Sequence, residues 1–188
     1  MSWYFFLLIS LALLRMMELR ISRRHQERLL AENGRLLTEP VYPMMVAVHM
    51  MLFFGSAAEV WWLERAFLPP LGWTMMFLLA ACIIGRIWVW RSLGEQWSTH
   101  VVASTRPIVD AGPYHYVRHP NYTIVIVEMF AIPLIHTAYL TALTCSVLNG
   151  FVLRARIRVE EAMLFSRLDY AAKMAKKPRF LPACGGER

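Results

Sequence analysis

The chain has little charge and few cysteines. Asp, Glu, Lys and Arg make up 18% of its 188 residues, whereas 57% of the residues are hydrophobic, a balance that is too apolar for a typical soluble domain. The three cysteines, Cys82, Cys145 and Cys184, form no CxxC motif and have no histidine at ligand spacing, which argues against disulfides and against a structural metal. The composition therefore predicts an integral membrane protein without a metal site.

Several motifs of soluble enzymes are also missing. The chain has no GxGxxG motif, Walker loop, HExxH motif or GxSxG motif, so a nucleotide-binding fold of the soluble type is not expected. The net charge of +7 comes from basic residues gathered in a few short stretches, a pattern typical of membrane topology. We therefore expect no nucleic-acid partner.

Long apolar runs predict the membrane spans. Residues 2–19, 41–63 and 71–90 are each long enough to cross a bilayer, which takes about 20 apolar residues. The first run has no basic segment before it and no small-residue cleavage site after it, which predicts a retained span and not a signal peptide. Residues 122–153 are long enough for two short helices that turn around residues 133–137, although one long kinked helix is an alternative.

The remaining segments are polar or basic. Residues 93–117 contain Gly and Pro and are too hydrophilic to span, whereas residues 154–177 carry apolar side chains at helical spacing with basic residues between them. The second pattern predicts an amphipathic helix that leaves the membrane and ends at Pro178. Because Lys and Arg gather after the first and third spans and in the tail, five spans predict an external N-terminus and a cytoplasmic C-terminus in a bacterial inner membrane.

The segment GPYHYVRHPNY, residues 112–122, leads directly into an apolar run. Pro120 suits the first turn of a helix, where its missing N–H has no intrahelical partner, so a helix is predicted to begin near His119. Free N–H groups and the positive end of the helix dipole would then lie beside Arg118, an arrangement suited to a carboxylate or a phosphate. The alternative is an interfacial anchor, because Tyr, Arg and His also collect at membrane–water boundaries.

The end of the last predicted span carries five charged residues, Arg154, Arg156, Arg158, Glu160 and Glu161. Four-residue spacing places Arg156 and Glu160 on one helical face, which we expect to face the polar segment. An Arg there can hold a planar anion, and a Glu can accept a hydrogen bond from an amine or a ribose hydroxyl. The other three point elsewhere and are interpreted as ion pairs and topology charges.

Ionisable residues also fall inside the predicted spans, at His49, Glu59, Arg86, Glu128 and His136. Charge within a membrane is costly and marks a functional candidate by default. We nevertheless expect structural roles, because Glu59 and His136 lie near outer ends where they can reach water. Arg86 can extend toward the interface or pair with Glu128.

The second half of the chain resembles a known family. The motifs are LGEQW at 93–97, HVV at 100–102, GPY at 112–114, RHPNY at 118–122, Arg156 with Glu160-Glu161, and RFLP at 179–182. In this order they resemble the C-terminal half of the isoprenylcysteine carboxyl methyltransferase family, integral-membrane enzymes that use S-adenosylmethionine. We therefore expect an all-α fold of about five transmembrane helices with a cytoplasmic cofactor-binding cap. Residues 1–92 would form the first three helices, and residues 93–188 the methyltransferase region.

The resemblance also implies the site residues. Those implied for the cofactor are His100, Ile108, Val109, Tyr114, His119, Pro120, Asn121, Tyr122 and Glu160. Arg156 is implied as the catalytic residue that handles the substrate. The chain departs from the family pattern where a small Gly often follows the Tyr, because Thr123 and Ile124 stand there.

The first half is more similar to short bacterial members of this family, through Arg15, Glu18, Arg20 and the Tyr42-Pro43 pair. Some of those accompany type III polyketide synthases and O-methylate alkylpyrones. A pyrone enolate resembles a carboxylate and carries a long apolar tail, so the expected acceptor is an acidic oxygen of a lipophilic molecule met in the membrane lipid. The alternatives are isoprenylcysteine carboxyl methylation, a phospholipid N-methyltransferase, a sterol-reductase-like NADPH enzyme with a similar RHPxY segment, and a non-catalytic scaffold.

Overall fold

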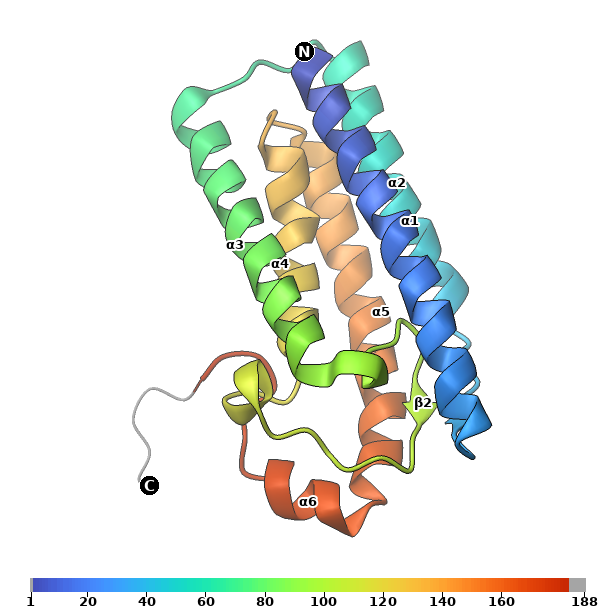
Figure 1. Cartoon of the computed structure of the whole chain (residues 1–188). Helices are drawn as coiled ribbons and strands as arrows, with labels where there is room; N and C mark the ends of the chain where they lie inside the picture. Colours follow the sequence, from blue (N-terminus) through green and yellow to red (C-terminus); the bar gives the residue numbers. More distant parts are fainter. Residues whose placement is uncertain (1, 183–188) are drawn as a thin grey trace.

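A computed structural model describes residues 2–182 as a bundle of long helices (Figure 1). The helices are α1 (Ser2–Ala31), α2 (Tyr42–Trp62), α3 (Pro69–Leu93), α4 (Pro120–Leu134), α5 (Tyr139–Phe165) and α6 (Leu168–Met174). Two short 3₁₀ helices, η1 (Gly94–Gln96) and η2 (Gly112–His115), and two short strands, β1 (Arg35–Leu36) and β2 (Val102–Ala103), complete the described elements. The start of α1 and helix α6 lie at opposite ends of the bundle.

Three helices within residues 2–182 are long and apolar enough to cross a membrane. They are α2, α5 and the stretch Pro69–Gln96, and α4 is a shorter apolar helix. Helices α2 and α3 confirm the second and third predicted apolar helices to within a few residues. Helix α1 is not one of the three, and it continues well past the predicted end of the first span to Ala31.

The bundle is held by contacts of α3 with α4, α4 with α5, and α5 with α2. Its core contains large buried side chains such as Leu52, Met129 and Ile132, and the Tyr4 hydroxyl donates to the Ile132 carbonyl at 3.0 Å. Large apolar side chains remain exposed on the outer faces, among them Phe77, which is 74% exposed. Such a surface is expected where a protein faces lipid and not water. Cys82 and Cys145 are free thiols, and Cys184 lies outside the described residues.

Helices α4 and α5 form a hairpin, so the alternative of one kinked helix is wrong. Thr137 makes the turn with a φ of 57° and donates from Oγ1 to the Ala66 carbonyl at 2.7 Å. Glu59 of α2 accepts hydrogen bonds from the backbone N–H groups of Leu140 at 3.1 Å and Thr141 at 2.7 Å. A carboxylate in this position satisfies N–H groups that a helix start leaves free. Glu59 is therefore structural, as expected, but it is 7% exposed and does not reach water.

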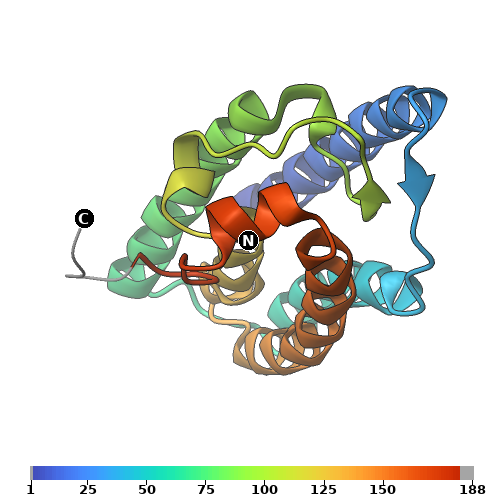
Figure 2. The ribbon, with the colours of Figure 1, turned by 90° about the horizontal axis from the view of Figure 1, so that it is seen from below.

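The single helix predicted over residues 154–177 is wrong. Helix α5 continues to Phe165, and the chain turns at Ser166 and Arg167 before α6 begins. The Arg167 guanidinium donates to the carbonyls of Ser104 at 2.5 Å and Arg106 at 3.0 Å. These bonds hold the turn against the polar segment, and Figure 2 shows α6 lying across the end of the bundle beside that segment.

A small antiparallel ribbon ties the two halves of the chain together. Arg35 of β1 pairs with Ala103 of β2, and Leu36 pairs with Val102. This strand pair departs from the purely helical expectation, because two-residue strands leave no periodic pattern in a sequence. It anchors the connection between α1 and α2 to the polar segment.

A cluster of buried charges joins α1, α3 and α4. Arg86 Nη2 lies 2.5 Å from Glu128 Oε2, so of its two alternatives Arg86 takes the pairing, and Arg15 Nη2 lies 2.5 Å from the same oxygen. Arg15 also bonds Glu18 at 2.6 Å. Two arginines and two glutamates thus neutralise one another, which is how charges tolerate burial. His136 is 3% exposed and packs on the Tyr4 ring, so the expectation that it reaches water is wrong.

Candidate active site

A cavity of about 460 Å³ lies where the bundle meets the polar segment and α6. Nine of the ten residues predicted from the sequence line it, namely His100, Ile108, Val109, Tyr114, His119, Asn121, Tyr122, Arg156 and Glu160. Pro120 does not line it and is buried in the first turn of α4, which begins where the sequence predicts. The volume falls in the range of roughly 300–1,000 Å³ that is usual for small-molecule sites.

One part of the cavity is apolar. Helix α2 begins at Tyr42 beside the polar segment and runs away from it, so that Phe53 lies about 16 Å deeper at 1.5 Å per residue. Met45, Val46 and Met50 line the wall between these two positions. This arrangement of an apolar wall beyond a polar segment suits a molecule with a polar head and an apolar tail. The residues Arg15, Glu18, His49 and Arg86 also line the cavity, so the charge cluster forms part of its wall.

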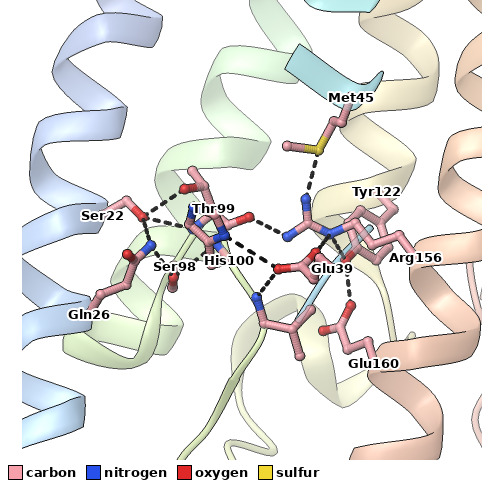
Figure 3. Close-up of polar contacts among 11 residues, drawn as sticks. Ser22, Gln26, Glu39, Met45, Ser98, Thr99, His100, Tyr122, Arg156 and Glu160 are labelled. Atoms are coloured by element: carbon pink, nitrogen blue, oxygen red, sulfur yellow. Dashed lines mark hydrogen bonds and ion pairs between the residues drawn. The ribbon is translucent and has the colours of Figure 1, made fainter. Parts of the chain in front are cut away.

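The polar part centres on Arg156, which is 5% exposed. Its Nε donates to the Tyr122 hydroxyl at 2.9 Å and lies 3.3 Å from Glu39 Oε2, and its Nη2 donates to the Thr99 carbonyl (Figure 3). The Tyr122 hydroxyl in turn donates to Glu160. Tyr122, Arg156 and Glu160 therefore form one connected chain, which confirms that Arg156 and Glu160 share the helical face turned to the cavity.

Sequence reasoning missed Glu39, whose side chain is 1% exposed. It accepts a hydrogen bond from the Val101 N–H at 2.6 Å, and its Oε1 lies 3.6 Å from His100 Nδ1. The His100 ring stacks on Tyr42 with centroids 3.8 Å apart. Burial lowers the pKa of His100, although Glu39 acts in the opposite direction. The one signal in the sequence is an acidic residue at the end of a basic stretch, directly before Pro40.

Glu161 was expected to point away from the site and to form ion pairs, and it does not line the cavity. It is 8% exposed, and its Oε1 lies 3.1 Å from His119 Nε2 and 3.2 Å from Arg118 Nη1. Arg179 of the tail bonds its other oxygen at 2.6 Å. The Glu161 carboxylate of α5 thus lies beside the start of α4, and Arg179 of the tail covers this carboxylate.

Several buried polar atoms of the cavity wall have no hydrogen-bond partner within residues 2–182. They are the acceptor Glu18 Oε1 and three donors, the Tyr170 hydroxyl, Arg118 Nε and Trp97 Nε1. Tyr170 is 4% exposed, and burial together with the charge of Glu160 raises its pKa, which keeps the hydroxyl protonated as a donor. Buried polar groups are almost always satisfied in folded proteins. Unsatisfied donors on a cavity wall therefore point to a polar ligand.

Comparison with known proteins identifies the family. The model described as the isoprenylcysteine carboxyl methyltransferase (ICMT) family matches residues 73–166, which hold most of α3, the polar segment, α4 and α5. The chain is also 32% identical over 166 residues to "Uncharacterized protein YpbQ" of Bacillus subtilis (strain 168), an alignment that covers 85% of this chain and 96% of that protein. The chain therefore belongs to the isoprenylcysteine carboxyl methyltransferase family, whose members are membrane methyltransferases that use S-adenosylmethionine.

Proposed function

We propose that this protein transfers a methyl group from S-adenosylmethionine to an acidic oxygen of a lipophilic substrate. The observation that carries the proposal is the position of Arg156 in the cavity. It lies between the apolar wall of α2 and the polar wall formed by α4, α5 and α6. The polar head of a substrate can therefore reach the Arg156 guanidinium and the cofactor, while the apolar tail of the substrate lies along α2. The preferred acceptor is a polyketide alkylpyrone, which a type III polyketide synthase would supply.

The residues of the polar wall fit S-adenosylmethionine. Tyr170 and Arg118 offer unsatisfied donors for a carboxylate or an adenine nitrogen, and Glu160 and Asn121 offer acceptors for an ammonium or a ribose hydroxyl. When bound, this cofactor supplies a methyl group on a positively charged sulfur, and an anionic acceptor needs no strong base to take it. Aromatic rings attract such a cation, and Tyr114 also lines the cavity, whereas the Tyr122 ring already has the Arg156 guanidinium 5.8 Å from its centroid.

Arg156 is proposed to orient the acceptor oxygen. Tyr122, Glu39 and the Thr99 carbonyl fix its guanidinium, whereas Nη1 contacts only the Met45 sulfur within the described residues, at 2.7 Å. A thioether is a weak acceptor. An anionic oxygen that replaced it would gain a charge-assisted bond worth about 1.5–3 kcal/mol. Alignment of reacting groups in such a fixed site can contribute roughly 7–11 kcal/mol to the rate.

We further propose that α1, α2, α3, the shorter α4 and α5 all cross the membrane, with the N-terminus outside and the polar segment in the cytoplasm of a bacterium. Helix α1 supports this count because Phe6 and Leu13 are 69% and 56% exposed along it. Residues 1–92 would then supply the apolar wall, and residues 93–188 the cofactor wall. Reporter fusions at Arg188 and in the 64–70 turn should report cytoplasmic and external positions, and the reverse result would refute the five-span topology.

The function is tested with the purified protein in detergent or nanodiscs. We expect it to bind S-adenosylmethionine and not NADPH, and NADPH binding alone would favour the reductase alternative. Labelled methyl transfer is then followed to an alkylpyrone, a farnesylated cysteine and a phosphatidylethanolamine. Transfer to the pyrone or the carboxylate supports the anion-holding site. Transfer to the amine lipid alone would refute it, because an amine nucleophile must be neutral and gains nothing from a guanidinium.

A further inference from the structure

A second cavity, of about 680 Å³, opens on the outer side of the α4–α5 hairpin. Apolar side chains of both helices and the three arginines Arg154, Arg158 and Arg179 line it. We propose that this groove binds one anionic phospholipid, with the phosphate on the arginines and an acyl chain along α5. The proposal is independent of the methyltransferase activity, because it uses a different face of α5.

The groove has the shape of an acyl-chain channel. Ser146, Gly150, Arg154 and Arg158 follow one another at four-residue spacing, so they form one stripe on α5 that is about 18 Å long. The two small residues leave the first half of the stripe open, and a Cβ added at Gly150 would meet no atom within 4 Å. Phe130 of α4 also lines the groove. The part of the stripe that precedes Arg154 is about 12 Å long, which matches most of the half-thickness of a bilayer core, about 15 Å, that one acyl chain crosses.

The other half of the stripe is strongly basic. Arg154 and Arg158 are exposed and form no ion pair within residues 2–182. Arg179 bonds Glu161, but that carboxylate is already shared with Arg118 and His119. The groove therefore keeps a net positive charge, and arginines bind phosphate well because their planar N–H groups match its oxygens. A zwitterionic lipid would bring an ammonium group into the same field, so an anionic head group is favoured.

The groove is separate from the candidate active site. Asn149 and Leu153 line both cavities and are 2% and 4% exposed, so they form the wall between them. Arg156 and Glu160 lie on the other side of this wall. A lipid in the groove would press against the wall of the active site without occupying it.

The test measures lipid retention without cofactor or methyl acceptor. Purified protein in micelles containing equal amounts of phosphatidylglycerol and phosphatidylcholine is analysed by native mass spectrometry. We expect about one phosphatidylglycerol per chain for the natural sequence, and at least a fivefold loss of that lipid in the double variant Arg154→Gln/Arg158→Gln. The double variant Arg20→Gln/Arg24→Gln removes the same charge from exposed positions on α1 and should retain the lipid.

A second variant tests the channel alone. Gly150→Phe keeps all three arginines and fills the open half of the stripe, and it should also lower retention of phosphatidylglycerol. The thermal midpoint in detergent reports whether each variant is folded. Equal retention of phosphatidylcholine by the natural sequence would overturn the proposal. So would full retention in both groove variants, or complete displacement of the lipid by millimolar inorganic phosphate, which would indicate a site for phosphate only.

Discussion

The carboxylate of Glu39 lies 3.3 Å from Nε of Arg156 and is a buried counter-ion for the guanidinium. Glu39 precedes α2, whereas Arg156 is in the second half of α5. The β1–β2 ribbon and the Val101 N–H hold Glu39 against the polar segment, and Arg156 bonds the Thr99 carbonyl of that same segment. A guanidinium that is bound in this way is oriented before any substrate arrives, which reduces the cost of alignment. Glu39 is thus a positioning residue for Arg156.

Replacing Glu39 with Gln should lower kcat for methyl transfer about tenfold or more, which corresponds to about 1.4 kcal/mol of barrier. The side chain keeps its shape and its bond from the Val101 N–H, but Arg156 loses its counter-ion. The KM for S-adenosylmethionine should change less than kcat, because Glu39 pairs with Arg156 and, among the residues implied for the cofactor, lies close only to His100, at 3.6 Å. Glu27→Gln, at an exposed position on α1, is the matched control. An unchanged kcat would show that Glu39 only stabilises the fold.

The neighbours Glu160 and Glu161 should have different roles. Glu160→Gln replaces the carboxylate beside the Tyr122 hydroxyl with a neutral amide and should weaken binding of S-adenosylmethionine about tenfold or more, as followed by calorimetry. Glu161→Gln removes the partner of His119 and Arg179 and should loosen the tail, so that limited proteolysis cuts near Arg179 sooner. If Glu161→Gln weakened cofactor binding more than Glu160→Gln did, the assignment of these two faces would be wrong.

The parts of the fold that follow from local sequence were predictable. Helices α2 and α3 are long apolar runs, and such runs form helices in lipid because every backbone group must be satisfied within the segment. The start of α4 follows from Pro120, which is favourable only in a first helical turn. Helical periodicity correctly placed Arg156 and Glu160 on one face, since about 3.6 residues per turn is a property of the backbone alone.

The parts that depend on distant contacts were not predictable. Arg167 ends α5 because it bonds carbonyls more than sixty residues earlier in the chain. Glu39 reaches the site through strands of two residues each, which give no pattern. Glu161 is one position beyond Glu160, so periodicity directs its side chain away from the cavity. Periodicity does not show that this side chain is buried, which follows from its contact with Arg179 of the tail.

Glu59 provides a test of stability that is independent of the site. Replacing Glu59 with Ala leaves the N–H groups of Leu140 and Thr141 and the Arg65 guanidinium without their acceptor. The loss of buried hydrogen bonds of this kind costs about 1–3 kcal/mol. The thermal midpoint in detergent should fall, whereas cofactor affinity of the folded protein should not change. Glu64→Ala in the neighbouring exposed turn should leave the midpoint near that of the natural sequence.

The stability of the polar segment should depend on pH through His100. Burial lowers the pKa of this imidazole in the folded protein, so the unfolded chain binds the proton more tightly. The stabilising contribution is therefore complete above the unfolded pKa of about 6.5 and is lost as the pH falls from there toward the lower folded value. Thermal midpoints at pH 7.5 and 5.5 should differ less for His100→Gln than for the natural sequence. An equal difference in both proteins would contradict this assignment.

The last prediction concerns Arg156 and the acceptor. Arg156→Ala should lower methyl transfer by about a hundredfold, or about 2.8 kcal/mol, because it removes the donor proposed to hold the anionic oxygen. It also leaves Glu39 buried without a counter-ion, so its thermal midpoint must be measured beside its activity. Arg156→Lys keeps the positive charge near Glu39 but lacks the planar pair of N–H groups, so it should restore stability more fully than turnover. Equal recovery of both would mean that the charge of Arg156 matters and its geometry does not.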